Sequence, residues 1–148
     1  MIALACDHGG FDLKESAIEV LKELGLEYKD LGTNDRKSVD YPVYGARAAR
    51  AVARGECDRG IILCGTGVGI GITANKVPGI RCVTCSDTYS ARMSRLHNNA
   101  NMIALGSRVL GTELAKDILR IWLTTDFSDE QRHREEMIAR VERGEEIE

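Results

Sequence analysis

The chain has 148 residues, of which 43% are hydrophobic and 29% are charged, and only two prolines. This length fits a single domain over residues 1–148, and the composition excludes a disordered chain. A net charge of −3 and an aromatic content of 5% argue against a nucleic-acid-binding surface. No apolar run approaches the roughly 20 residues that cross a bilayer, so neither nucleic acid nor membrane is an expected partner.

The first apolar run, residues 2–6, is too short for a signal sequence and lacks a basic segment before it. We therefore expect a first strand here and a cytoplasmic protein. The odd number of cysteines, five, makes a disulfide framework unexpected. Cys82 and Cys85 form a C-x-x-C pair, but in a strand they would face opposite sides, which favours buried core thiols over a zinc or redox site.

Strand-like and helix-like segments alternate along the rest of the chain. The expected strands are residues 2–6, 27–31, 60–64, 81–85 and 102–105. The expected helices are residues 13–24, 42–54, a short one ending near 76, 87–98, 113–123 and 129–143. Gly25 is expected to stop the first helix, Pro42 to sit in the first turn of the second, and Ser86 to cap the fourth.

This alternation predicts an α/β domain with a five-stranded parallel sheet. The expected strands at residues 2–6, 60–64 and 102–105 are uniformly apolar, which agrees with helices on both faces of the sheet. Ligands of such sheets bind at the carboxyl ends of the strands, near the topological switch point. We expect four polar segments at that edge: Asp7-His8, the loop after Cys64, His97-Asn98, and Gly106-Ser107-Arg108.

The strongest local signal is the segment Cys64-Gly65-Thr66-Gly67-Val68-Gly69-Ile70-Gly71. Alternating glycines between a strand and a helix expose backbone N–H groups that can bind an anion. The spacing matches neither the dinucleotide fingerprint nor a Walker A loop. Cys64 at the mouth of such a loop suits a thiolate base that removes a proton beside a carbonyl. A plain connector and a buried strand-end thiol remain the alternative interpretation.

Six motifs together resemble the type B ribose-5-phosphate isomerase family, which includes allose-6-phosphate and galactose-6-phosphate isomerases. They are Asp7-His8-Gly9-Gly10-Phe11, Asp40-Tyr41-Pro42, the Cys64–Ile70 segment, Asn75-Lys76, His97-Asn98-Asn99-Ala100-Asn101 and Gly106-Ser107-Arg108-Val109. The resemblance implies a Rossmann-like three-layer sandwich. It also implies an aldose–ketose isomerase without metal or cofactor, which interconverts ribose 5-phosphate and ribulose 5-phosphate through a cis-enediolate.

The resemblance also implies a role for each site residue. Cys64 would move the proton between C1 and C2, and His97 would help open the furanose ring. The anionic intermediate would be held by Thr66 and the amides of Gly65, Gly67, Val68 and Gly69. The sugar hydroxyls would be placed by Asp7, Tyr41 and Asn98, and the phosphate would be held by His8, Arg108 and Arg132.

Family members are homodimers or homotetramers, so the resemblance further implies sites shared between subunits. His97, Asn98 and the C-terminal arginines would reach the partner's site, and the helix at 129–143 would pack on the partner. One position departs from the family pattern: Glu136 stands where an arginine commonly follows Arg132 by one helical turn. We expect Glu136 to pair with Arg132 instead.

Three alternatives remain open. The departure at Glu136 leaves room for a hexose 6-phosphate of the allose or galactose type as the substrate. A non-catalytic module that binds a phosphorylated ligand would use the same glycine loop, but it would need neither Cys64 nor His97. An inactive subunit of a heteromeric isomerase is disfavoured because both of these residues are present.

Overall fold

The computed structural model describes the whole chain, residues 1–148, as five strands, six α-helices and one short 3-10 helix. In chain order the elements are β1 (Ile2–Cys6), α1 (Phe11–Glu23), β2 (Tyr28–Asp30), α2 (Tyr41–Ala53), β3 (Arg59–Cys64), α3 (Val68–Asn75), β4 (Cys82–Thr84), α4 (Thr88–Leu96), β5 (Met102–Gly106), α5 (Thr112–Thr124), η1 (Asp129–Gln131) and α6 (Arg132–Glu142).

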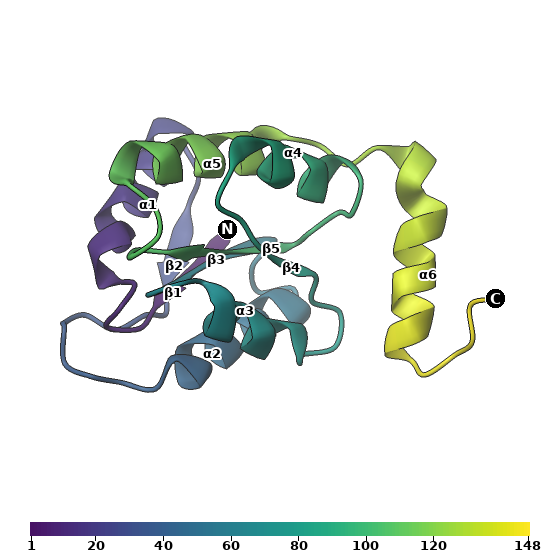
Figure 1. The fold of residues 1–148 in the computed structure, drawn as a ribbon, viewed down its shortest axis with the longest axis horizontal. Helices are drawn as coiled ribbons and strands as arrows, with labels where there is room; N and C mark the ends of the chain where they lie inside the picture. The colour runs from purple at the N-terminus through teal and green to yellow at the C-terminus, as the bar shows by residue number, and fades with distance from the viewer.

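The strands form one parallel sheet in the order β2-β1-β3-β5-β4. Helices α1, α4 and α5 cover one face, and α2 and α3 cover the other (Figure 1). The predicted Rossmann-like three-layer sandwich is therefore confirmed. From β1 the chain first adds β2 on one side and then β3 on the other, so the switch point lies between β1 and β3.

Each face of the sheet has its own apolar core. Along β1, Ile2, Leu4 and Cys6 face α1 and α5, whereas Ala3 and Ala5 face α2. Cys85 belongs to the first core and Cys82 packs against the second, so the two cysteines do face opposite sides. Burial raises the pKa of Cys82 to about 12 and that of Cys85 to about 11, which keeps both as thiols at neutral pH.

Helix ends follow local capping rules, with one difference from the sequence prediction. Gly25, with a φ of 66°, follows α1, and its N–H donates to Lys22 O while that of Leu26 donates to Leu21 O. The fourth helix is capped by Asp87, not by Ser86. The Asp87 carboxylate accepts from Ser90 N at 2.6 Å, because its extended backbone points the side chain at the free N–H groups of the first turn.

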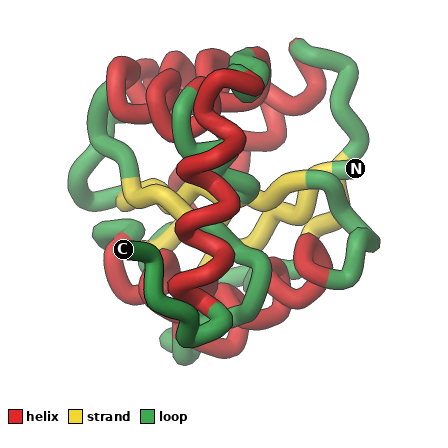
Figure 2. The backbone as a smooth tube through the Cα atoms, turned by 90° about the vertical axis from the view of Figure 1, so that its right-hand side faces the viewer, coloured by secondary structure: helices red, strands yellow, loops and turns green.

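The C-terminal helix α6 stands apart from the three layers. None of its residues is buried, whereas α5 buries five, including Trp122. In Figure 2, which looks at the molecule from that side, α6 runs in front of the sheet and crosses its strands. The chain contains no helix whose length and apolar character would allow it to cross a membrane.

Candidate active site

Cys64 is the last residue of β3, next to the switch point, and only 5% of its surface is exposed. Its Sγ accepts a hydrogen bond from the Gly67 N–H at 3.0 Å. The strand supplies the rigid position, and the turn that follows folds back so that one amide points at the sulfur. This donor would compensate negative charge on a thiolate.

The loop after Cys64 lies close over the end of β5. Gly67 has a φ of 79°, and a Cβ on it would stand 3.0 Å from the backbone carbon of Leu105. A residue with a side chain would meet both backbone strain and a steric clash there. The Thr84 hydroxyl donates to Gly67 O at 3.2 Å and holds the turn from the side of β4. The loop is therefore held in place by contacts with β4 and β5.

The segment after β1 lies at the same edge of the sheet as the glycine loop. Asp7 is 6% exposed, and its Oδ1 accepts from the Gly10 N–H at 2.9 Å. His8 is half-buried and its Nδ1 accepts from the Val39 N–H at 3.1 Å. A neutral imidazole that accepts at Nδ1 carries its proton on Nε2, which is then free to donate to a ligand.

Arg108 and Tyr41 complete this edge of the sheet. The Arg108 N–H donates to Gly65 O at 3.0 Å, and its side chain lies against Gly65, where a Cβ would be 3.3 Å from Nη1. The Tyr41 ring covers Gly69 so closely that a Cβ there would be 2.7 Å from Cζ. The structure thus brings Asp7, His8, Tyr41, Arg108 and the Cys64–Gly69 loop together. No cavity of the single chain is lined by Cys64.

His97 and Asn98 lie elsewhere, and the prediction that they share the edge of Cys64 within one chain is wrong. Helix α4 starts beyond the carboxyl end of β4 and returns, so its last residues reach the amino ends of the strands. Asn98 O accepts from Nε of Arg81, the residue just before β4. Both His97 and Asn98 are exposed. A crossover helix must run back before the next parallel strand begins, which is the physical reason for the difference.

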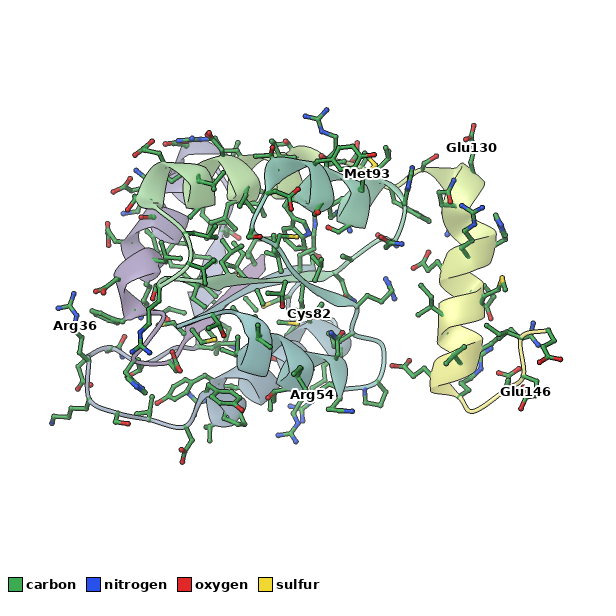
Figure 3. All side chains as sticks on the ribbon, viewed as in Figure 1. Arg36, Arg54, Cys82, Met93, Glu130 and Glu146 are labelled. Carbon is green, nitrogen blue, oxygen red and sulfur yellow. The ribbon has the colours of Figure 1, made fainter.

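Arg132 also lies away from Cys64, at the start of α6. It pairs with Asp129 and lies over the Phe127 ring, 5.6 Å from its centre. The predicted pair between Glu136 and Arg132 is wrong: Glu136 binds Arg143 at 3.0 Å. In Figure 3, Glu130 of η1, two residues before Arg132, lies at the end of the molecule opposite to Arg36 of the β2–α2 loop.

Two residues that support the site were not assigned from the sequence. Thr84 holds the glycine loop, as described above, and the Ser107 hydroxyl donates to Gly9 O, joining the segments after β5 and β1. Both residues lie at or just beyond the carboxyl end of a strand, and this position in the sequence could have identified them as neighbours of the site. No group of three or more His, Cys, Asp or Glu side chains is arranged to hold a metal ion.

A family model described as Ribose/Galactose Isomerase matches residues 2–139 of this chain. The chain belongs to this family. It is 53% identical over 126 residues to ribose-5-phosphate isomerase B of Escherichia coli, with 85% of each chain covered. The solved structure of ribose-5-phosphate isomerase B from Clostridium thermocellum matches with a TM-score of 0.93 and 50% identity, covering 97% of each chain. The family and the isomerase class expected from the sequence are confirmed.

Other relatives carry other substrates in their names. The D-erythrulose-4-phosphate isomerase of Pectobacterium atrosepticum is 45% identical over 127 residues, covering 85% of this chain and 84% of its own. The galactose-6-phosphate isomerase subunit LacB of Clostridium acetobutylicum is 42% identical over 135 residues, covering 91% of this chain and 78% of its own. Membership of the family therefore establishes a sugar-phosphate isomerase without selecting the sugar.

Proposed function

We propose that this protein interconverts ribose 5-phosphate and ribulose 5-phosphate through a cis-enediolate, without metal or cofactor. The observation that carries the proposal is Cys64 at the switch point, with its sulfur 3.0 Å from the Gly67 N–H at the mouth of the glycine loop. A base next to a cluster of amide donors is what proton transfer beside a carbonyl requires. The ribose 5-phosphate name of the relative at 53% identity supports the choice of sugar.

The chemistry balances with the groups at this edge. The Cys64 thiolate removes the proton from C2 of the open-chain aldose, and the electron pair forms the C1–C2 double bond while charge moves to O1. Thr66 and the amides of Gly65, Gly67, Val68 and Gly69 would stabilise that charge, with the Gly67 and Val68 N–H groups turning from Cys64 Sγ and Thr66 Oγ1 to the substrate oxygen. The thiol then returns the proton to C1, and the proton of O2 passes to O1, leaving a carbonyl at C2. No electron is gained or lost overall, so no redox cofactor is needed.

The remaining groups of this edge suit substrate binding. Asp7 and Tyr41 flank the loop from two sides and would place sugar hydroxyls. His8 has Nε2 free, and Arg108 lies against the loop, so the two would hold the phosphate. The resemblance to the family assigns ring opening to His97, which lies away from this edge within one chain.

We infer that His97, Asn98 and Arg132 complete the site of a second copy of this chain. Both His97 and Asn98 are exposed, and they lie at the opposite end of the strands from Cys64. The segment 129–143 would pack on that partner, because Met137, Ile138 and Val141 on α6 leave apolar surface uncovered, with 36% to 54% of each residue exposed. The assembly would be a homodimer or homotetramer with shared sites.

A hexose 6-phosphate is the second candidate substrate. Glu136 pairs with Arg143 and leaves Arg132 without a second arginine one turn away, so a two-arginine phosphate clamp is missing on α6. The galactose-6-phosphate name of the relative at 42% identity supports this candidate.

One panel tests the proposal. Ketose formation is measured with ribose 5-phosphate, allose 6-phosphate and galactose 6-phosphate, and aldose formation with erythrulose 4-phosphate and ribulose 5-phosphate. We expect the highest kcat/KM with the pentose pair, and activity that survives exhaustive chelation. A higher kcat/KM for a hexose or tetrulose phosphate would identify that sugar as the substrate instead. The absence of turnover with every sugar would contradict the proposed function.

A further inference from the structure

The turn that follows α4 has a backbone conformation that needs support. Asn99 has a φ of 48° and is the only residue other than glycine with a positive φ in the chain. Asparagine tolerates this left-handed conformation better than most residues, but it still costs free energy. Asn99 directly follows His97 and Asn98, so the three residues form one turn, and contacts that hold Asn99 also hold the backbone that carries those two exposed side chains.

Two arginines hold this turn by its backbone. Arg81 donates from Nε to Asn98 O at 3.2 Å and from Nη2 to Asn99 O at 2.9 Å. Arg95, only 7% exposed, donates from Nη1 to Ala100 O at 2.7 Å and to Asn99 Oδ1 at 3.0 Å. Burial lowers the pKa of Arg95 to about 10, so it stays charged at neutral pH.

Glu135 of α6 closes the network from the other side. Its Oε1 accepts from Asn99 Nδ2 at 2.9 Å and pairs with Arg81 Nη2 at 3.0 Å. The Asn99 amide therefore lies between a pure donor, Arg95, and a pure acceptor, Glu135, which fixes its orientation. The side chains of Arg81 and Glu135 are 24% and 19% exposed, so this pair is more protected from solvent than the other ion pairs of α6.

The same helix carries Arg132, one turn before Glu135. One carboxylate thus ties the element that presents Arg132 to the turn that presents His97 and Asn98. We propose, resting on the shared site of the proposed function, that Glu135 is a positioning residue. Through Asn99 and Arg81 it locks α6 and the His97–Asn98 turn into one unit, so that both reach the partner's sugar in a fixed relative geometry.

The first test measures order in the turn and needs no substrate. Amide hydrogen exchange is compared for the full-length wild type, Glu135→Ala, Glu135→Gln and Glu142→Ala. Glu142 is the matched control, because it also joins α6 to the body, accepting from Gly79 N at 3.0 Å, but it does not touch the turn. We expect residues 97–101 to exchange about tenfold faster in Glu135→Ala and no faster in Glu142→Ala.

The Gln variant keeps the fold testable if the Ala variant unfolds. It can still accept from Asn99 but loses the charge that pairs with Arg81, so its exchange should lie between those of wild type and Glu135→Ala. Unchanged exchange at 97–101 in both Glu135 variants would overturn the proposal.

The second test asks whether the order of this turn is needed for the proposed role of His97. We expect Glu135→Ala to lower kcat on the cyclic aldose phosphate by roughly 10- to 10²-fold, the cost of a misplaced group. The part of this loss that acts through the imidazole is absent in a His97→Asn background, so the same change should lower kcat by much less there, with only the contribution through Arg132 remaining. An equal loss in both backgrounds would contradict the positioning role. Failure of the proposed function would look different, since the wild type itself would then be inactive while the exchange result would stand.

Discussion

The two ends of the parallel sheet are built in different ways. At the carboxyl ends, the groups of the site hold one another: Cys64 takes an amide of its own loop, Thr84 holds that loop, and Tyr41 covers it. At the amino ends, His97 and Asn98 are exposed, and the hydrogen bonds from Arg81 reach only backbone carbonyl oxygens of their turn. The groups at the carboxyl ends are held by contacts within the chain, whereas those at the amino ends present their side chains outward.

In the proposed mechanism, this contrast divides the reaction between two copies of the chain. Proton transfer needs a base and an anion site at fixed separation, and a strand end with a rigid loop provides both. Ring opening needs a further acid or base, and the proposed mechanism assigns this role to His97 of a second copy. The two ends can be compared by the reaction step they serve, by the chain that supplies their residues to a site, and by their rigidity.

The largest effect is expected at the carboxyl end. Cys64→Ala should lower kcat by about 10²–10⁴-fold, the usual contribution of a general base, while the protein stays folded. The matched control is Cys82→Ala, since Cys82 is a thiol whose pKa burial raises to about 12 and which lies at the start of β4. Turnover of ribose 5-phosphate by both variants is the measurement. Near-wild-type activity in Cys64→Ala would return Cys64 to the role of a core thiol.

A smaller and direction-dependent effect is expected at the amino end. His97→Asn should slow the reaction of the cyclic aldose phosphate by about 10²-fold, because ring opening needs a proton donor and acceptor near neutral pH. Ribulose 5-phosphate cannot close to a furanose through its phosphorylated O5, so the opposite direction starts from an open chain and should lose less. Initial rates are followed before ring closure in solution re-equilibrates. Equal losses in both directions would exclude the ring-opening role.

Mixing two inactive variants tests whether Cys64 and His97 of one site come from different chains. Cys64→Ala and His97→Asn chains, refolded together in equal amounts, should recover about a quarter of wild-type activity. Half of random dimers are mixed, and each mixed dimer holds one intact site of two. Each variant refolded alone serves as the control. A mixture no more active than its components would place His97 outside the partner's site.

The smallest effect concerns the rigidity of the glycine loop. Gly67→Ala should destabilise the protein by more than the about 1–2 kcal/mol that a left-handed backbone alone costs, because its Cβ would also clash with Leu105. Gly25→Ala isolates the backbone term, since Gly25 has a φ of 66° but open space around it. Urea unfolding of both variants measures the difference. Equal losses would mean that the loop does not depend on close packing over β5.

Much of the fold could be predicted from the sequence because its signals are local. The five segments predicted as strands became the five strands, and Gly25 ends α1 as expected. Strands β2 and β4 are shorter than predicted, with three residues each, because each lies at a sheet edge with one neighbour. The cap of α4 was misassigned, because Ser86 and Asp87 are both good caps and only the backbone path selects Asp87.

The sequence by itself determined the α/β architecture, the glycine loop with Cys64 at its mouth, and the family, because these depend on the order of residues along single strands and turns. Only the tertiary structure decided that His97 lies at the opposite end of the sheet from Cys64, that Glu136 pairs with Arg143, and that Glu135 joins α6 to the turn after α4. These facts depend on where a returning helix ends and on which distant side chains meet there. The physical reason is that hydrophobic periodicity specifies which face of an element is buried, whereas polar contacts between elements form only after the layers have packed.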